Sequence, residues 1–499
     1  MTVWFDVEDL FHYIRSGNKR ISGIQRLTLE IYRAAHQLAG GTGRIGFVRH
    51  GSRLLSFKVV EWAEIAAQFE ADEQTEAQPP RALAPLPASG LAPPRRSGLR
   101  GAAANLANRL PDEVRRPLVL ASVMQVQAAG ELGRAGFNLL RYPAVAAARH
   151  SRRVAGDMGW ALAARVKASA TRPAREPARP SFDDLARPGD TVLVLGSPWF
   201  RQDYSAIARW LRDERRIRFG LLVHDLVPIR RPEWCHAGIA RTFEGWYADL
   251  LPFCDLVLAN SRHTAGDVEA YAAESGITLP GPVRPVPVGT GFGLPAAGER
   301  PAHLPEAGSY VLFVSTMEAR KNHALVVRVW RKLLDEVQAG TRPASSVPDL
   351  LFAGRVGWLV ADLMQQLENT QWLGGRVRMI RDPSDADLRA LYQGSLFTVF
   401  PSLHEGWGLP VTESLALGTP CLSSNAAALP EAGGALCRYF DPEDAGSAHR
   451  AVAALLDDRP GLEAWRAQVR REFRPTPWTD TAQAVLDRVA ELDGAAARP

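Results

Sequence analysis

The 499-residue sequence is poor in cysteine and has no apolar run long enough to cross a membrane. Its cysteines are scattered and form no CxxC pair, so we predict neither a cysteine zinc site nor a disulfide framework. A membrane-spanning helix would need about 18 consecutive apolar residues. The first residues, MTVWFDVEDL, place acids where a secretory signal has a basic start and an apolar run. We therefore expect a cytoplasmic protein.

A strong overall charge is also missing, because the formal net charge is +5. Residues 81–180 hold 17 Lys and Arg against 5 Asp and Glu, which leaves the rest of the chain net negative. A basic region confined to one segment does not give the chain the composition of a nucleic-acid-binding protein. We predict no nucleic-acid partner.

The sequence lacks a GxGxxG turn that follows a strand, opens a helix and is followed by an acid about 20 residues later. The nearest string, VGTGFG (288–293), runs into a proline-rich segment instead. This argues against a dinucleotide-dependent oxidoreductase.

Two parts of the chain alternate short apolar runs with longer amphipathic ones, a pattern typical of parallel sheets covered by helices on both faces. The C-terminal part predicts five strands, at 310–316, 349–354, 377–380, 397–402 and 420–424, with four helices between them. The N-terminal part predicts strands at 190–197, 218–225 and 255–260, and helices at 23–40, at 204–215 and from 261. We predict an α/β fold with two Rossmann-like, doubly wound domains.

The predicted domains are 1–297, 298–475 and a C-terminal helical segment, 476–499, that crosses back to the first domain. A Gly- and Pro-rich linker at 288–305 is the expected hinge. The Ala-, Arg- and Pro-rich stretch 71–185 is interpreted as an insertion with helices around 102–110, 116–132 and 137–168. This insertion could bind an anionic membrane surface or be a solvated basic linker, and we leave both open.

Two carboxylates flank a glycine-rich turn in HEGWGLPVTESLALG (404–418). Glu405 follows a predicted parallel strand, at the edge of the sheet where open α/β folds bind ligands. Gly406 and Gly408 let the backbone approach a ligand, and Glu413 falls in the first turn of the next helix. An acid there is often a simple helix cap, but a second acid just outside the same helix is not needed for folding. Two fixed carboxylates suit a polyhydroxylated ligand.

Two cations come from another strand-to-helix junction. Arg320 and Lys321 lie in STMEARKNH (315–323), after the first C-terminal strand. We expect them at the same sheet edge as Glu405, where they could neutralise a diphosphate.

These motifs resemble those of a known family, the retaining, metal-independent GT-B glycosyltransferases of family four. The resemblance is carried by the Glu-x7-Glu spacing and by STMEARKN, LLFAGRVGW (350–358) and SDADLRALYQGS (384–395). It is weaker in the N-terminal part, at SGIQRLTLEI (22–31), VHDLVPIRRPE (223–233) and LANSRHT (258–264). It implies two Rossmann-like domains that face each other across a cleft.

The resemblance implies roles for individual residues. Glu405 and His224 would lie beside the transferred hexose and the acceptor, and Lys321 with Arg320 would offset the charge of the departing diphosphate. Glu413 would hold the ribose diol. Backbone N–H groups would bind sugar or phosphate oxygens at four positions: Gly406, Trp407, Gly408 and Leu409. Gly23 would let its loop approach the donor phosphate.

One departure from the family pattern concerns the phosphate site. Many relatives have a Gly-Arg pair where this chain has Ser315 and Thr316, so one phosphate-binding arginine is absent. We therefore expect Arg320 and Lys321 to bind the phosphate. The DxD-like strings DVED (6–9) and DPED (441–444) are interpreted as surface turns or caps. We therefore expect no metal ion and no cofactor in the reaction, with the nucleotide-diphosphate sugar as donor substrate.

The donor and acceptor are less defined by the sequence. The motifs TMEARKNH and GRVGW look most like those of the mannosyl- and rhamnosyl-transferring branch, which favours GDP-mannose, with the base bound by backbone near 377–381. The resemblance implies a hexosyltransferase in surface polysaccharide assembly, peripheral at the inner membrane face, with a glycan or polyprenyl-diphosphate-linked acceptor. The alternative is a catalytically silent sugar-nucleotide-binding partner in a polysaccharide assembly complex.

Overall fold

The computed structural model describes residues 1–15, 23–40, 44–51, 55–74, 180–201, 203–235, 237–291 and 300–496. The chain divides into two compact units, 1–82 together with 180–499, and 83–179. The first unit holds both Rossmann-like domains. The helices expected at 102–110, 116–132 and 137–168 lie outside the described residues.

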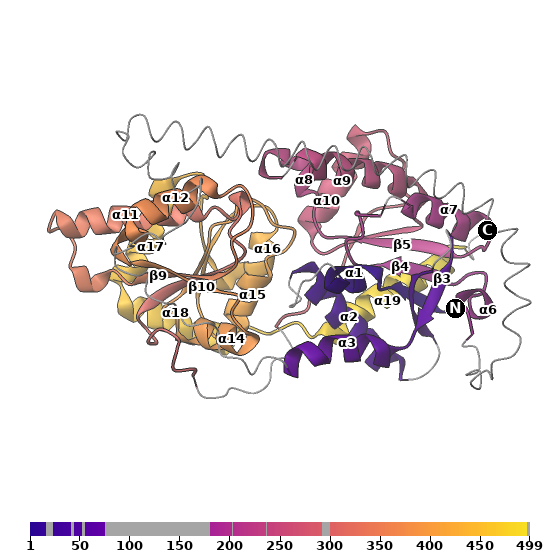
Figure 1. Ribbon diagram of the computed structural model, residues 1–499, viewed down its shortest axis with the longest axis horizontal. Helices are drawn as coiled ribbons and strands as arrows, with labels where there is room; N and C mark the ends of the chain where they lie inside the picture. The colour runs from indigo at the N-terminus through magenta and orange to yellow at the C-terminus, as the bar shows by residue number, and fades with distance from the viewer. Residues whose placement is uncertain are drawn as a thin grey trace, which may run out of the picture. The chain divides into compact units, whose positions relative to one another are not determined.

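The N-terminal domain is built on a seven-stranded sheet of order β3-β2-β1-β4-β5-β6-β7 (Figure 1). Strand β3 runs antiparallel to β2, and the other neighbouring strands pair in parallel. The strands are β1 (Val3–Asp6), β2 (Ile45–His50), β3 (Phe57–Val60), β4 (Thr191–Val194), β5 (Arg218–Val223), β6 (Leu256–Ala259) and β7 (Arg284–Pro285). The described helices before the linker are α1 (Glu8–Arg15), α2 (Ile24–Ala39), α3 (Trp62–Gln74), α6 (Phe182–Leu185), α7 (Tyr204–Asp213), α8 (Val227–Arg230), α9 (Ala237–Leu250) and α10 (Arg262–Glu274).

Both faces of this sheet are buried, as strand β4 shows. Val192 and Val194 belong to one apolar cluster, and Leu193 belongs to another on the opposite face. This follows from the two-residue period of a strand, which turns successive side chains to opposite faces. A strand buried on both faces reads as a continuous apolar run, and all four residues of β4 are buried.

The C-terminal domain has a six-stranded parallel sheet of order β10-β9-β8-β11-β12-β13. Its strands are β8 (Tyr310–Val314), β9 (Asp349–Gly354), β10 (Val377–Arg381), β11 (Thr398–Phe400), β12 (Cys421–Ser424) and β13 (Arg438–Phe440). Its helices are α11 (His323–Gln338), α12 (Ala361–Asn369), α13 (Gln371–Gly374), α14 (Asp385–Gly394), α15 (Leu409–Ala416), α16 (Leu429–Gly433), α17 (Ala445–Asp457) and α18 (Arg459–Glu472). A further helix, α19 (Trp478–Ala496), follows.

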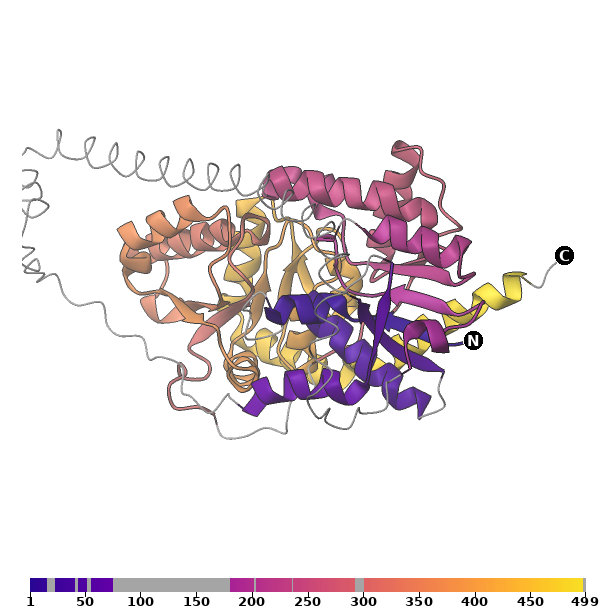
Figure 2. The ribbon, with the colours of Figure 1, turned by 45° about the vertical axis from the view of Figure 1, so that its right-hand side comes forward.

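Helix α19 packs against the N-terminal domain, beside the elements at the start of the chain (Figures 1 and 2). Its residues Ala482, Val485 and Val489 lie in the same buried cluster as Val3 and Phe5. The chain therefore passes between the two domains twice, once before α19 and once before β8.

These two crossings are hydrogen-bonded to each other. The Thr290 amide donates to the Thr476 carbonyl (2.8 Å), and the Trp478 indole donates to the Gly291 carbonyl (2.9 Å). A Cβ at Gly289 would lie 2.2 Å from the Trp478 ring, so glycine allows this close contact. Residues 292–299, in the middle of the predicted linker, lie outside the described part of the chain.

The structure corrects several sequence-based boundaries. Strands β1, β2, β3, β7 and β13 were not predicted from the sequence. The expected insertion 71–185 overlaps the end of α3 and all of α6, so it is shorter than predicted. Within the described ranges, no helix combines the length and the apolarity that a membrane crossing needs.

Candidate active site

The C-terminal sheet changes direction between β8 and β11. Successive strands run outward from β8 through β9 to β10, and then from β11 through β12 to β13. The loops after β8 and β11 therefore lead to opposite sides of the sheet at the carboxyl ends of the strands. Open α/β sheets bind their ligands in the crevice at such a position. Arg320 and Lys321 follow β8, and Glu405 follows β11.

Glu405 lies between the two cations. Its Oε2 is 2.6 Å from Nη1 of Arg320, and its Oε1 is 2.5 Å from Nζ of Lys321. Arg320 also donates to the His404 carbonyl at 3.0 Å, which fixes the start of the glycine-rich loop. The structure thus brings Glu405 together with two adjacent predicted site residues that lie 84 and 85 positions before it.

Charge pairing decides the protonation of this group. Burial would raise the pKa of Glu405, but Arg320 and Lys321 outweigh it and lower the pKa to about 2. Burial likewise opposes the charge on Arg320, yet Glu405 and Glu318 raise the pKa of the guanidinium. Burial and the nearby Arg320 lower the pKa of Lys321. Glu405 is therefore a carboxylate at neutral pH.

Glu318 is a fourth charged member that was not predicted. Its Oε1 is 2.7 Å from Nη2 of Arg320, and the residue is buried. Burial raises the pKa of Glu318, and its Oε2 has no hydrogen-bond partner among the described residues. It lies in the motif STMEARKN, but an acid next to two cations in sequence reads as an ordinary surface turn.

Glu413 has a different environment from Glu405. Its Oε2 accepts a hydrogen bond from the Tyr392 hydroxyl at 2.9 Å, and both residues are buried. Burial raises the pKa of Glu413 to about 7, although the charge of Arg26 and the Tyr392 hydroxyl act in the opposite direction. Tyr392 was not assigned a role from the sequence, because a tyrosine in a helix is more often a core residue.

Arg26 connects the N-terminal domain to this part of the C-terminal one. It comes from helix α2, and its Nη2 is 2.8 Å from both carboxylate oxygens of Asp385 at the start of α14. Asp385 raises the pKa of Glu413 and Arg26 lowers it, so both lie close enough to affect its charge. The 359 residues between Arg26 and Asp385 explain why the sequence did not predict this pair.

The glycine-rich loop is packed against the N-terminal domain. A Cβ at Gly406 would lie 1.8 Å from the carbonyl oxygen of His224, so the two backbones touch where glycine stands. Gly408 has a φ of 124°, a value that residues other than glycine rarely adopt. Trp407 and Leu409 pack against the apolar cluster of the N-terminal sheet. The amides predicted to bind the donor thus lie where the domains meet.

His224 and Gly23 are the predicted site residues of the N-terminal domain. The His224 ring is buried at the end of β5, its Nε2 donates to the Leu195 carbonyl at 2.7 Å, and burial lowers its pKa. The ring is therefore neutral and anchored to the backbone. Gly23 precedes α2 with a φ of 55°, and no described atom lies within 4 Å of a Cβ built there.

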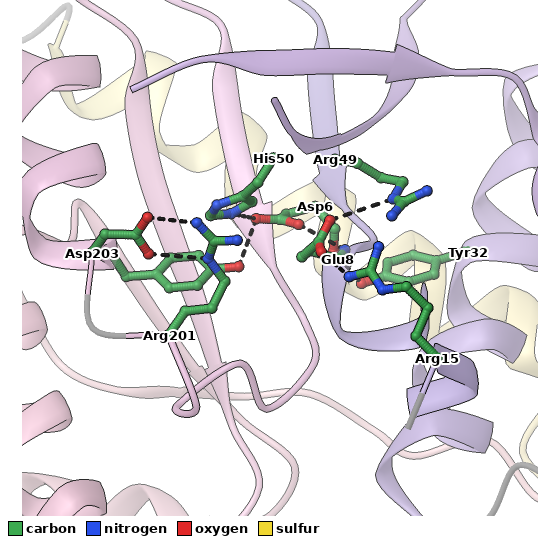
Figure 3. Close-up of polar contacts among 9 residues, drawn as sticks. Asp6, Glu8, Arg15, Tyr32, Arg49, His50, Arg201 and Asp203 are labelled. Carbon is green, nitrogen blue, oxygen red and sulfur yellow. Dashed lines mark hydrogen bonds and ion pairs between the residues drawn. The ribbon is translucent and has the colours of Figure 1, made fainter. Parts of the chain in front are cut away.

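The string DVED (6–9), predicted to be a surface turn or a cap, does not lie on the surface. Asp6, Glu8 and Asp9 are buried at the carboxyl end of β1, and Figure 3 shows Asp6 and Glu8 with their partners. Asp6 Oδ2 accepts from the Tyr204 hydroxyl (2.8 Å) and lies 3.0 Å from His50 Nε2, and Asp6 Oδ1 accepts from the Glu8 amide (2.9 Å).

Glu8 is paired in the same way, with Arg15 at 2.5 Å and Arg49 at 3.3 Å (Figure 3). The acids of Asp6 and Glu8 thus stabilise the end of the strand through protein donors. The other string, DPED, is an exposed cap as predicted: Asp444 accepts from the Gly446 amide at the start of α17.

The comparisons with known proteins concern mainly the C-terminal domain. Residues 299–472 match the model of the family glycosyl transferases group 1. The C-terminal domain of this chain is therefore similar to that family, in agreement with the resemblance of its motifs. The predicted fold class, two Rossmann-like α/β domains of the GT-B type, is also confirmed.

Two curated relatives are mannosyltransferases by name. The serotype-specific mannosyltransferase WbdA of Escherichia coli is 27% identical over 292 residues, which are 55% of this chain and 34% of that protein. The O-antigen chain mannosyltransferase B of Escherichia coli is 31% identical over 157 residues, 32% of this chain and 38% of that protein. The chain thus spans between about a third and two fifths of the length of these relatives.

Among solved structures, the sucrose-phosphate synthase from Thermosynechococcus elongatus matches with a TM-score of 0.44 at 20% identity. The match covers 61% of this chain and 74% of that one. The two sheets of this chain define its fold independently of this match.

Proposed function

We propose that this protein is a hexosyltransferase that moves a sugar from a nucleotide-diphosphate donor to a glycan or a lipid-linked acceptor during surface polysaccharide assembly. The observation that carries the proposal is the buried group of Glu405, Arg320 and Lys321, in a domain that matches the family model of the glycosyl transferases group 1. Such a domain places these charges at the sheet edge where a ligand is expected.

The two cations suit the departing diphosphate. As the bond to the sugar breaks, negative charge grows on the phosphate, and fixed cations in a buried site stabilise it without reorganising. Arg320 can bind phosphate oxygens with two parallel N–H groups, and Lys321 adds a compact charge. Both cations now pair with Glu405, so the donor phosphate would share them with that carboxylate.

Glu405 would then accept hydrogen bonds from hydroxyls of the hexose. The low pKa of Glu405 keeps it an acceptor throughout the neutral range. We propose transfer with retention, in which the leaving phosphate takes the proton of the acceptor on the same face of the sugar. The protein contributes positioning and charge stabilisation, and no metal ion takes part in this step.

Glu413 would hold the ribose diol of the donor. Hydroxyl groups that donate to a carboxylate favour its charged form, so donor binding would lower a pKa that now stands at about 7. The backbone of β10, residues 377–381, is the proposed contact of the base.

We propose GDP-mannose as donor, because the two Escherichia coli relatives are named mannosyltransferases. A polyprenyl-diphosphate-linked acceptor would place the enzyme at the inner membrane face. The basic stretch 71–185 is the proposed contact with anionic lipid, and most of it lies outside the described residues.

The test begins with thermal unfolding in the presence of UDP-, GDP-, ADP- and TDP-sugars. The donor should give the largest increase in Tm, because a ligand that binds the folded state stabilises it. Turnover of that donor is then measured with and without added acceptor. We expect Lys321→Ala to lower kcat by at least about 100-fold with a smaller change in donor affinity, since it acts on the leaving group.

The matched control is Lys332→Ala, which removes an exposed lysine from α11 in the same domain. It should leave both constants unchanged. A wild-type protein that binds a nucleotide sugar and never turns it over would instead support the silent-partner alternative. A protein that binds none of the four donor classes would contradict the proposal as a whole.

A further inference from the structure

Helix α10 is the element of the N-terminal domain that contacts the C-terminal domain around the glycine-rich loop. The backbone amide of Arg262, in its first turn, donates to both carboxylate oxygens of Glu431 at 3.1 and 3.0 Å. The Thr264 hydroxyl lies 3.3 Å from the Gly406 carbonyl oxygen and donates to it. These contacts place the first two turns of α10 against the segment that carries Glu405.

Three further side chains meet at this contact. His263 and Asp267 are four residues apart on α10, and that spacing puts them on one face of the helix. His404 comes from the other domain, directly before Glu405. One ligand atom from each, Nε2 of the histidines and Oδ2 of Asp267, lies within 4.8 Å of the other two.

These three atoms are buried, yet none has a hydrogen-bond partner among the described residues. Asp267 Oδ2 is 3.5 Å from His263 Nε2 and 3.6 Å from His404 Nε2, which is too long for a hydrogen bond. A buried polar atom without a partner costs about 1–3 kcal/mol. Three such atoms that point at one another need a common partner.

A divalent ion fits these distances. With ligands at about 2.0–2.2 Å, a tetrahedral site has ligand atoms about 3.4 Å apart. The two histidine-to-aspartate distances are close to that value, and the ligand atoms of the two histidines lie within 4.8 Å of each other. Two imidazoles and one carboxylate suit zinc and similar transition-metal ions, with water as a fourth ligand.

We propose that His263, Asp267 and His404 bind a divalent transition-metal ion of the zinc type and so join the two domains beside the active site. The ion would tie α10 to the loop that carries Glu405. Arg320 donates to the His404 carbonyl, so a bound ion would also steady the cation that pairs with Glu405. The site uses neither DxD-like string and holds no donor group, so it stands apart from the transfer step proposed above.

The proposal is tested with the full chain after treatment with a chelator. Co²⁺ is titrated into the protein, and its visible absorption reports the number and geometry of its ligands. We expect one equivalent of Co²⁺ to bind with the spectrum of a tetrahedral site and to be displaced by Zn²⁺. His404→Ala and Asp267→Asn should each weaken binding by at least about tenfold, because each removes one of three protein ligands.

The matched control is His303→Ala. His303 also pairs with an aspartate, Asp387, at 3.0 Å, but it lies outside the proposed site. This variant should bind Co²⁺ as the wild type does. X-ray absorption of the zinc-loaded wild type gives a second readout that needs no variant, and it should show two imidazole ligands.

Three results would overturn the proposal. The first is a wild-type protein that does not bind one equivalent of Co²⁺. The second is Co²⁺ affinity in His404→Ala and Asp267→Asn equal to that of the wild type. The third is an X-ray absorption spectrum of the zinc-loaded protein without two imidazole ligands. Each would leave an ordinary ion pair between α10 and His404. Metal binding is measured without any sugar donor, so its failure would not count against the proposed transferase activity.

Discussion

At the scale of single residues, the pKa values of two buried glutamates that are eight positions apart are shifted in opposite directions. The cations beside Glu405 lower its pKa to about 2, whereas burial raises the pKa of Glu413 to about 7. Environments that separate the pKa values of two acids mark functional sites. The pair thus offers one permanent carboxylate and one whose charge depends on what binds next to it.

Replacing Glu413 by glutamine should stabilise the free protein at high pH. Its folded pKa of about 7 lies above the ordinary value of 4.5, so the fold favours the protonated acid. The stability that protonated Glu413 contributes to the fold is fully present below pH 4.5 and is lost as the pH rises through 7. Glu413→Gln should therefore gain up to about 3 kcal/mol over the wild type above pH 7 and little below pH 4.5.

The free energy of unfolding, measured by denaturant titration across this pH range, checks this prediction. Glu463→Gln changes an exposed glutamate of α18 and is the control, for which we expect little change in stability. A stability difference for Glu413→Gln that does not change between pH 4 and 8 would contradict the buried, elevated acid. The same variant should bind the nucleotide sugar more weakly.

Replacing Glu405 by glutamine should have the opposite effect on stability. It leaves two buried cations without their shared carboxylate, and breaking a buried ion pair from one side costs about 3–5 kcal/mol. The folded pKa of about 2 lies below the ordinary 4.5, so the loss should be complete above pH 4.5 and should shrink as the pH falls towards 2.

Unfolding measured at several pH values tests this, with the exposed Glu443→Gln as control. That control should stay within about 0.5 kcal/mol of the wild type. The double variant Glu405→Gln with Lys321→Met should recover part of the lost stability, because the Lys321→Met change removes one of the two unpaired positive charges. A Glu405 variant as stable as the wild type would show that the cations do not depend on this acid.

At the scale of elements, the loop between β11 and α15 joins the two domains through backbone contact. Gly406 touches the His224 carbonyl, and Trp407 and Leu409 pack on the N-terminal apolar cluster. The conformation of Gly408 then starts α15, with Pro410 in its first turn. The loop thus works as a docking element between the two domains.

Gly406→Ala should disturb this docking. The added methyl group would lie 1.8 Å from a backbone oxygen, so the loop or β5 must move. We expect a loss of about 1–3 kcal/mol in stability, as in other overpacked sites, together with slower donor turnover. Scanning calorimetry and steady-state kinetics measure both.

Gly245→Ala is the matched control, because Gly245 lies inside α9 and a methyl group added there would have no described atom within 4 Å. Alanine favours a helix interior by up to about 1 kcal/mol over glycine, so this variant should be neutral or more stable. Wild-type stability and turnover in Gly406→Ala would mean that the loop does not dock on β5 as described.

At the scale of the whole molecule, charged contacts connect elements that are far apart in sequence. Arg26 of α2 pairs with Asp385 of α14, next to Glu413. The two chain crossings are hydrogen-bonded to each other at Thr290 and Thr476. Movement of one domain relative to the other would therefore change the surroundings of Glu413.

Arg26→Ala should raise the pKa of Glu413 further, because the positive charge of Arg26 lowers it. The stability cost should be no more than about 1 kcal/mol, as for other partly exposed ion pairs. At pH 7 donor affinity should fall several-fold, and raising the pH should restore part of it. Donor titrations between pH 6 and 9 test this.

Arg33→Ala removes another arginine from the same helix, one paired with Glu30 within α2, and serves as control. Its donor affinity should follow the wild type at every pH. If the donor affinity of the Arg26 variant depends on pH as in the wild type, the Arg26–Asp385 pair does not influence donor binding.

The sequence predicted the parts of this protein that depend on local patterns. The apolar runs of β8, β9, β5 and β6 and the glycine turn before α15 were recognisable because strands and helix starts have short-range signals. The short strands β1 and β13 were missed for lack of such a signal. The burial of the acids of DVED was not predicted, because β1 is only four residues long and is buried on both faces, so no alternating pattern shows that Asp6 is buried.

Sequence alone determined the two-domain α/β architecture, the similarity of the C-terminal domain to the glycosyl transferases group 1 and the candidate residues Glu405, Arg320 and Lys321. Tertiary structure decided that these three form one buried charged group, that Glu413 pairs with Tyr392, and that His404 meets α10. The physical reason is distance along the chain. Local periodicity fixes which face of an element is apolar, whereas charge pairing and burial depend on segments that only folding brings together.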